Sequence, residues 1–114
     1  MIPLMIAVTI TSYNPHVAQT DNTPEVGASG RNLVIAAKEG DRTIALSRDL
    51  LWYYGKGKIK WHDKVKLVSD NPQCNGLFSV EDTMNKRFSN RADMFFLSRK
   101  DNTSCKALLH HSSR

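Results

Sequence analysis

The chain has 114 residues, a hydrophobic content of 40% and a formal net charge of +5. This length predicts a single domain, residues 1–114, with a modest core that needs neither metals nor many disulfides. The composition excludes wholesale disorder, and the positive charge favours a polyanionic partner such as nucleic acid, anionic lipid or the anionic cell wall, or serves solubility alone.

The first ten residues, MIPLMIAVTI, are apolar but too short to span a bilayer, so no membrane span is expected. They also lack the basic start and the small-residue cleavage site of an export signal. A strand is predicted over Ile6–Tyr13, where β-branched residues alternate with smaller or polar ones, and Asn14 and Pro15 end it. The long polar stretch His16–Gly30 predicts a loop, and loops of this length in compact domains are often functional.

The middle of the chain predicts short strands and one short helix. Asn32–Ala37 indicates a short strand or extended piece, and Thr43–Leu46 a buried strand. Ser47 is a candidate N-cap for a short helix over Arg48–Tyr54, which two glycines end. Asp63–Val68 alternates lysines with apolar residues, the pattern of a half-buried strand.

The last third of the chain predicts three more strands, over Gly76–Asp82, Arg91–Leu97 and Lys106–His110. A basic loop is expected at Met84–Asn90, and a turn or single helical turn at Ser98–Thr103. Six or seven short strands with regular turn signals favour a small closed barrel over a sandwich. We therefore expect a mainly β fold with one or two short helices.

The cysteines and histidines give no sign of a metal site. Cys74 and Cys105 are too few for a disulfide scaffold, and they form either one disulfide in an oxidising compartment or two buried thiols. None of the four histidines has metal-ligand spacing. No metal and no cofactor is expected.

Two carboxylates are candidates for chemistry. Asp82 ends one predicted strand and Asp93 begins the next, so a short connection could bring both to one rim of a barrel. Two carboxylates at one rim repel, so one of them keeps its proton near neutral pH and becomes available as a general acid. The alternative is that both are strand-end residues that accept hydrogen bonds from turn amides.

The loop between the two aspartates offers amides, cations, hydroxyls and one aromatic side chain. This mixture suits sugar hydroxyls, lactyl carboxylates or phosphates, and it equally suits a plain solvated loop. The candidates for substrate binding in this region are Thr83, Lys86, Asn90 and Arg91.

A cluster of aromatic residues lies near several lysines in the middle of the chain. Aromatic rings beside cations suggest a nucleic-acid-binding barrel, but only if the rings lie on an open face. We prefer a core aromatic set beside a solvated lysine loop, so no nucleic acid is expected. The residues concerned are Trp52, Tyr53, Tyr54 and Trp61, with Lys56, Lys58 and Lys60.

The stretch Val80–Asp93, VEDTMNKRFSNRAD, resembles the signature of the three-aspartate (3D) domain family. That pattern is an Asp-Thr pair, a short loop and then Asn-Arg-x-Asp; here 93 − 82 = 11, the family's spacing between the two aspartates. Upstream segments also resemble the family's opening strand, first loop, middle segment and penultimate strand. These are TSYNP at 11–15, QTDNTP at 19–24, IALSRDLL at 44–51 and GLFSV at 76–80.

The resemblance implies a six-stranded double-psi β-barrel, similar to the catalytic barrel of membrane-bound lytic transglycosylase A. Such enzymes cleave the β-1,4 bond between N-acetylmuramic acid (MurNAc) and N-acetylglucosamine (GlcNAc) and leave a 1,6-anhydro sugar. By this resemblance Asp93 is the catalytic acid and base, and Asp82 tunes its pKa and binds substrate. Tyr13, Thr20 and Asp21 are expected to bind substrate, with Asp21 on a loop that borders the same cleft.

The chain departs from the family pattern at two places. Met84–Ser89 replaces a glycine-rich loop, although Lys86 keeps a cation there. Ser47 stands where many members carry an aspartate, for which Asp49 and Asp21 are candidate substitutes. A noncatalytic barrel that binds the cell wall is therefore the alternative to the enzyme.

The resemblance also implies where the protein works. Peptidoglycan glycan strands are the expected partner, and the cell envelope, the periplasm or the extracellular space is the expected location. A bacteriophage protein or a secreted lysis protein is compatible with the missing export signal. The sequence leaves the oligomeric state open.

Overall fold

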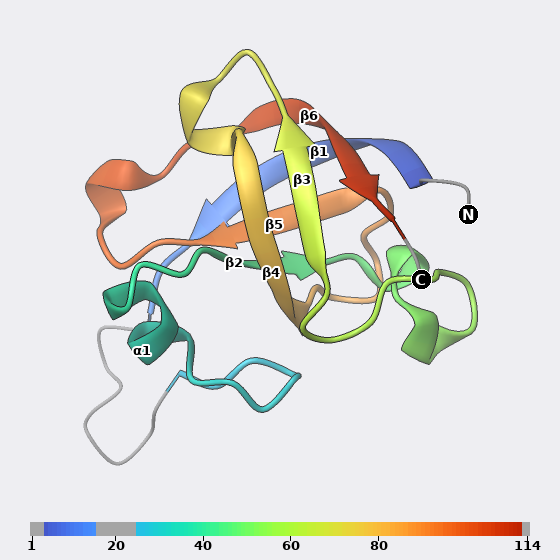
Figure 1. Ribbon diagram of the computed structural model, residues 1–114, viewed down its shortest axis with the longest axis horizontal. Coiled ribbons are helices and arrows are strands. Elements are labelled where there is room, and N and C mark those ends of the chain that lie inside the picture. The colour runs from blue at the N-terminus through green and yellow to red at the C-terminus, as the bar shows by residue number, and fades with distance from the viewer. Residues whose placement is uncertain (1–3, 16–24, 113–114) are drawn as a thin grey trace.

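The computed structural model describes residues 4–15 and 25–112. Its main element is a β-barrel of six strands (Figure 1). The strands are β1 (Leu4–Tyr13), β2 (Thr43–Leu46), β3 (Lys64–Val68), β4 (Gly76–Thr83), β5 (Arg91–Phe95) and β6 (Cys105–His111). The remaining elements are one helix, α1 (Leu33–Lys38), and four 3₁₀ turns, η1 (Arg48–Leu50), η2 (Trp52–Tyr54), η3 (Pro72–Cys74) and η4 (Arg99–Asp101).

The strands close in the order β1-β5-β2-β4-β3-β6. Two neighbouring pairs, β1 with β5 and β2 with β4, are parallel, and the other four pairs are antiparallel. The expectation of a mainly β, closed six-stranded barrel is confirmed, and its mixture of parallel and antiparallel pairs is consistent with a double-psi arrangement. Among residues 4–15 and 25–112, no helix has the length and apolar character needed to cross a membrane.

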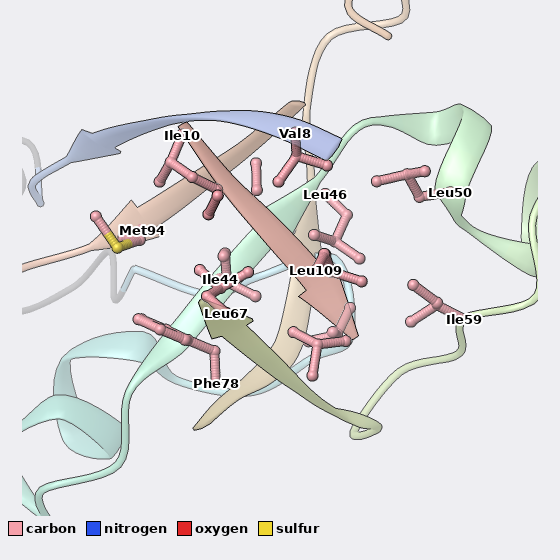
Figure 2. Packing of buried hydrophobic residues seen from close by; sticks show 14 of the residues in the cluster. Val8, Ile10, Ile44, Leu46, Leu50, Ile59, Leu67, Phe78, Met94 and Leu109 are labelled. Carbon is pink, nitrogen blue, oxygen red and sulfur yellow. The ribbon is translucent and has the colours of Figure 1, made fainter. Parts of the chain in front are cut away.

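The inside of the barrel is filled by alternate residues of its strands. In β3 the burial alternates strictly, with Val65 and Leu67 inside and the lysines outside. Figure 2 shows side chains from different strands meeting in this core, among them Ile10, Ile44 and Leu109, each fully buried. Leu50 and Ile59 extend the cluster from the barrel to the η1 region.

The structure corrects the prediction of a strand or extended piece at Asn32–Ala37. Leu33–Lys38 is a helix, because the Asn32 side chain accepts a hydrogen bond from the Ile35 amide at 3.0 Å and caps the first turn. Leu33 and Ala36, three positions apart, are its buried residues. The burial of residues three positions apart is the spacing of a helix, not of a strand.

The single helix predicted at Arg48–Tyr54 is also wrong in detail. Two 3₁₀ turns occur instead, because Leu51 between them is extended and pairs with Ile59 in an isolated parallel bridge. Ser47 does precede the first turn, but its side chain makes no capping hydrogen bond.

The two cysteines form a disulfide. Cys74, at the end of η3, is bonded to Cys105, at the start of β6, with their Cα atoms 6.9 Å apart. This bond settles the alternative between a disulfide and two free thiols. It ties the η3 turn to β6.

Candidate functional site

Asp82 and Asp93 lie in one row across three neighbouring strands. Asp93 of β5 pairs with Ala45 of β2, and Ala45 pairs with Asp82 of β4 on its other side. On its far side Asp93 pairs with Thr11 of β1. Cross-strand partners share one face of a sheet, so the two carboxylates lie on the same face with only the small Ala45 side chain between them. The residues on either side of Ala45 in β2, Ile44 and Leu46, belong to the core. Because successive side chains of a strand point to opposite faces, the row of Asp82, Ala45 and Asp93 faces away from the barrel interior.

Asp93 is a partly buried carboxyl group with few donors. The Thr11 hydroxyl donates to its Oδ1 atom at 2.9 Å. Burial raises the pKa of Asp93, and the negative charge of Asp82 raises it further. The Thr11 hydrogen bond and the positive charge of Arg91 act in the other direction, but the net pKa is raised. Asp93 therefore favours its protonated form more than an ordinary aspartate does.

Asp82 has a different environment, because three donors converge on its carboxylate. The amide of Ala28 donates to Oδ1 at 3.0 Å, and the residue's C-terminal neighbour, Thr83, donates its own amide to the same oxygen at 2.8 Å. The Tyr13 hydroxyl donates to Oδ2 at 3.3 Å. Within residues 4–15 and 25–112, Asp82 thus accepts three hydrogen bonds, while Asp93 accepts one.

Tyr13 connects the two carboxylates electrostatically. Burial raises the pKa of Tyr13 far above its ordinary value, and the charges of Asp82 and Asp93 raise it further. The phenol therefore stays protonated and acts as a hydrogen-bond donor at any physiological pH. Its ring packs edge-on against Phe95, with the centroids 5.2 Å apart, which fixes its direction.

A β-bulge next to Asp82 brings a second acidic side chain to this region. The pairing of β2 with β4 shifts between Ile44 and Ala45, so Glu81 is an extra residue without a partner on β2. The Glu81 side chain is fully buried. It accepts hydrogen bonds from the hydroxyls of Ser29, at 2.7 Å, and Ser79.

Two basic side chains complete the surroundings of Glu81. His62 Nδ1 lies 2.8 Å from Oε1, and Arg31 Nη1 lies 3.3 Å from Oε2. Burial raises the pKa of Glu81, but the hydrogen bonds from Ser79 and Ser29, together with His62 and Arg31, outweigh it, and the net pKa is lowered. Glu81 is therefore a buried carboxylate that fastens the 25–32 segment to β4, next to Asp82.

The loop between the two aspartates is anchored at its end. Asn90 has a φ of 51°, a left-handed conformation that asparagine tolerates well. Its amide donates to Asp49 Oδ2 at 3.0 Å, and the next amide, of Arg91, donates to the Ser47 hydroxyl at 3.1 Å. The guanidinium groups of Arg87 and Arg91 both lie over the Phe88 ring, 4.6 and 4.8 Å from its centroid.

Ser47 is fully buried, and its hydroxyl serves the backbone of β5. Asp49 holds the same loop from the other side through one oxygen, and its Oδ1 atom is buried without a hydrogen-bond partner in the described chain. These two residues position the start of β5, and with it Asp93. Asp49, the candidate substitute for the aspartate that Ser47 replaces, therefore anchors the loop through the Asn90 amide.

The predicted site residues divide into three groups. Tyr13 and Arg91 lie on the strand face of the two aspartates, two positions from members of that row. Thr83 reaches Asp82 only through its backbone amide, because it pairs with the core residue Leu46 and its hydroxyl donates to the Leu46 carbonyl at 3.2 Å. Lys86 is exposed on the connecting loop, and Asn90 has the turn role described above. The predicted site residues Thr20 and Asp21 lie outside the described residues.

Sequence reasoning did not identify Thr11, Ala28 or Glu81. Thr11 could have been found, because it precedes Tyr13 by two positions and therefore shares its face of the strand. The Ala28 contact uses a backbone amide, which leaves no mark in the residue type. Glu81 could have been noticed as a charge directly after the buried Val80 of β4.

Among the residues that the structure describes, no three histidine, cysteine, aspartate or glutamate side chains gather in a way that could hold a metal ion. Comparison of the chain with models of protein families, with curated proteins and with solved structures finds no match.

Proposed function

We propose that this protein is a lytic transglycosylase that cleaves peptidoglycan glycan strands, with Asp93 as the general acid and base. The observation that carries this proposal is the contrast between the two carboxyl groups of one row. Among the described residues, Asp93 has one hydroxyl donor and a raised pKa, whereas Asp82 is held by three donors. Such an asymmetric pair is the usual basis for assigning one carboxyl as the acid.

The reaction needs one group that first gives and then takes a proton. Protonated Asp93 donates to the glycosidic oxygen, the bond from this oxygen to the anomeric carbon of MurNAc breaks, and GlcNAc leaves with a free hydroxyl. The carboxylate then removes the proton from the C6 hydroxyl of MurNAc. The C6 oxygen bonds to the anomeric carbon, which closes the 1,6-anhydro ring and returns the proton to Asp93.

Asp82 and Tyr13 have supporting roles in this scheme. The negative charge of Asp82 keeps the pKa of Asp93 high and would stabilise positive charge that develops on the sugar ring. Tyr13 stays protonated and holds Asp82 in place. Arg91 and Lys86 supply cations for the lactyl or peptide carboxylates of the substrate.

One observation favours the alternative, a barrel that binds the wall without cleaving it. Ser47 replaces the third aspartate of the related pattern, and its buried hydroxyl accepts a hydrogen bond from the Arg91 amide. A residue used in this way contributes no proton to a substrate. If the third aspartate is needed for bond cleavage, the same surface would bind glycan and release it unchanged.

The test is mass spectrometry of purified peptidoglycan after incubation with the chain and with Asp93→Asn. We expect anhydro-muropeptides from the native chain and a loss of roughly 10²–10⁴-fold or more in the variant, because one group serves both proton transfers. Asp70→Asn is the matched control, since Asp70 is exposed on the turn after β3. Intact binding of the glycan by the native chain without any anhydro product would select the binding barrel instead.

A loss of activity in Asp93→Asn must not come from unfolding, and the raised pKa gives a way to check this. The ionised Asp93 carboxylate costs stability in the fold, a cost that is absent below the unfolded pKa of about 3.9 and grows as pH rises through the folded pKa. The amide carries no charge, so the variant should melt no lower than the native chain at pH 7. A variant that melts far below the native chain at pH 7 would contradict the assignment of Asp93 as a strained functional acid.

A further inference from the structure

A large basic groove has neither Asp82 nor Asp93 among its lining residues. It has a cavity volume of about 1090 Å³ and is lined by the 52–66 region, Leu77 of β4 and the end of β6. Figure 1 shows the turns of the η2 region and the end of β6 on the same side of the barrel. In the part of the chain that the structure describes, the lining includes four lysines, Lys58, Lys60, Lys64 and Lys66, together with three histidines and one carboxylate, Asp63.

The positive charge of the groove is only partly compensated. Asp63 accepts from His111 Nε2 at 2.9 Å, and His62 Nδ1 lies 2.8 Å from the buried Glu81 carboxylate. Lys64 shares Asp41 at 3.4 Å with an arginine. No carboxylate of the described residues lies within ion-pair distance of the other three lysines, whose side chains are exposed. The groove therefore has a surplus of positive charge that an anionic ligand would neutralise.

The fold builds this groove from two sides. On β3, Lys64 and Lys66 alternate with buried residues, so both project from the same outer face. On the other side, Gly57 lies so close to the η1 backbone that an added Cβ would be 2.0 Å from the Leu50 carbonyl carbon. This approach folds the 55–60 segment back and brings Lys58 and Lys60 to the groove.

One aromatic ring in the groove has a free surface. Trp52 is 56% exposed, and Lys60 Nζ lies 4.8 Å from its ring centroid. The neighbouring rings of Tyr53 and Trp61 are stacked on each other at 4.8 Å, so they use one face of each ring internally. Trp52 is thus available to pack against the carbon atoms of a sugar or polyol.

We infer that the groove binds an anionic polyol-phosphate polymer attached to the cell wall, an inference that rests on the proposed function in the wall. The ammonium group of lysine is a compact charge that donates hydrogen bonds to phosphate from several directions. None of the described residues that line the groove is an arginine. The volume lies at the upper end of the range of small-ligand pockets, which leaves room for more than one phosphate unit.

Single-stranded nucleic acid has the same charge but fits the lining less well. Its binding without sequence preference relies on aromatic rings that stack successive bases, and among the described residues that line the groove only Trp52 offers such a ring. The disulfide between Cys74 and Cys105 also favours an oxidising compartment over the cytoplasm, where nucleic acid is abundant.

The test uses the full-length chain with the Asp93→Asn change, so that no glycan is cleaved during the measurement. Co-sedimentation compares Gram-positive walls that carry poly(glycerol phosphate) with the same walls after hydrofluoric acid has removed this polymer. We expect strong binding to the intact walls and weak binding to the stripped walls. With about four phosphate contacts, raising the salt from about 50 to about 200 mM should weaken binding roughly 50-fold.

A double variant, Lys58→Gln with Lys66→Gln, should weaken binding to intact walls by about 30-fold, the loss expected for two phosphate-contacting lysines. The matched control is Lys100→Gln with Lys106→Gln, two exposed lysines outside the groove, and it should bind as the parent does. Equal binding to intact and stripped walls, or unchanged binding by the groove variant, would overturn the inference. Tighter binding to a single-stranded oligonucleotide than to free poly(glycerol phosphate) would overturn it in favour of nucleic acid.

Failure of this inference is distinct from failure of the proposed function. Binding of soluble poly(glycerol phosphate), measured by calorimetry, requires no glycan cleavage. Polymer binding without release of anhydro-muropeptides would support the groove inference and contradict the proposed enzymatic function. Release of anhydro-muropeptides without polymer binding would support the enzymatic function and contradict the groove inference.

Discussion

The pKa of Asp93 is set by neighbouring groups that act in opposite directions. Burial and the Asp82 charge raise its pKa, and the Thr11 hydroxyl and the Arg91 charge lower it. The acid and base steps need both forms of the same carboxyl group, so a pKa that is raised by some neighbours and lowered by others suits the reaction. Substituting any of these neighbours should therefore shift the pH dependence of activity.

Asp82→Asn tests this dependence directly. The substitution removes a negative charge from the same face, so the pKa of Asp93 falls and the acid loses its proton at a lower pH. We expect the alkaline limb of the activity profile to move to lower pH, with residual activity at its optimum. A pH series of anhydro-muropeptide yield measures the shift, and an unmoved limb would show that the two carboxyl groups are not coupled.

At the scale of elements, the bulge in β4 and the 25–32 segment form one unit. The Ser29 amide donates to the Glu81 carbonyl at 3.0 Å, and the Ala28 amide donates to the Asp82 carboxylate. Gly27 makes this approach possible, because an added Cβ would lie 2.3 Å from the Glu81 carbonyl oxygen. A connecting segment outside the barrel thus determines how Asp82 is held.

Gly27→Ala should push this segment away from β4 and remove the Ala28 amide from Asp82. We expect a loss of about 1–3 kcal/mol in the free energy of unfolding, the usual cost of inserting a methyl group into a filled space. Urea denaturation measures it, and glycan cleavage should fall in parallel. Val26→Ala is the control, since Val26 belongs to the same segment with a side chain that is 48% exposed. Equal stability of the two variants would contradict the close packing of this unit.

The strands were predictable from sequence because their alternation is strong, as in Lys64–Val68. The run LVIAAK was not, since a short apolar run has no decisive period and the cap at Asn32 decides it. The proximity of Asp82 and Asp93 was expected, but the row through Ala45 depends on which strands become neighbours, and a single sequence does not give this order. The Ala28 contact was beyond prediction because any residue supplies a backbone amide.

For the molecule as a whole, the disulfide joins two points that are 31 residues apart in sequence. Cys74 is fully buried next to the core, and the bond links η3 to the strand that pairs with β1 and β3. The enclosed chain contains β4 and β5, which carry both aspartates. The cross-link therefore restrains the unfolded chain around the candidate site.

The double variant Cys74→Ala with Cys105→Ala tests this contribution. For a closed loop of this length the loss of chain entropy corresponds to about 3–4 kcal/mol in the free energy of unfolding. We expect the urea midpoint of the oxidised chain to fall accordingly, and reduction with dithiothreitol to lower the native midpoint by a similar amount. A midpoint that is insensitive to both changes would show that the closed loop contributes nothing.

The strand order has a consequence for how the polypeptide acquires its shape during synthesis. β1 is the first strand to leave the ribosome, yet both its neighbours, β5 and β6, are made last, and Leu4 pairs with His111. The first strand therefore waits, with its hydrogen-bonding edges unpaired, until nearly all described residues have been translated. Pairings between such distant residues form slowly, which places folding on the millisecond to second scale of barrels and after the last strand has emerged.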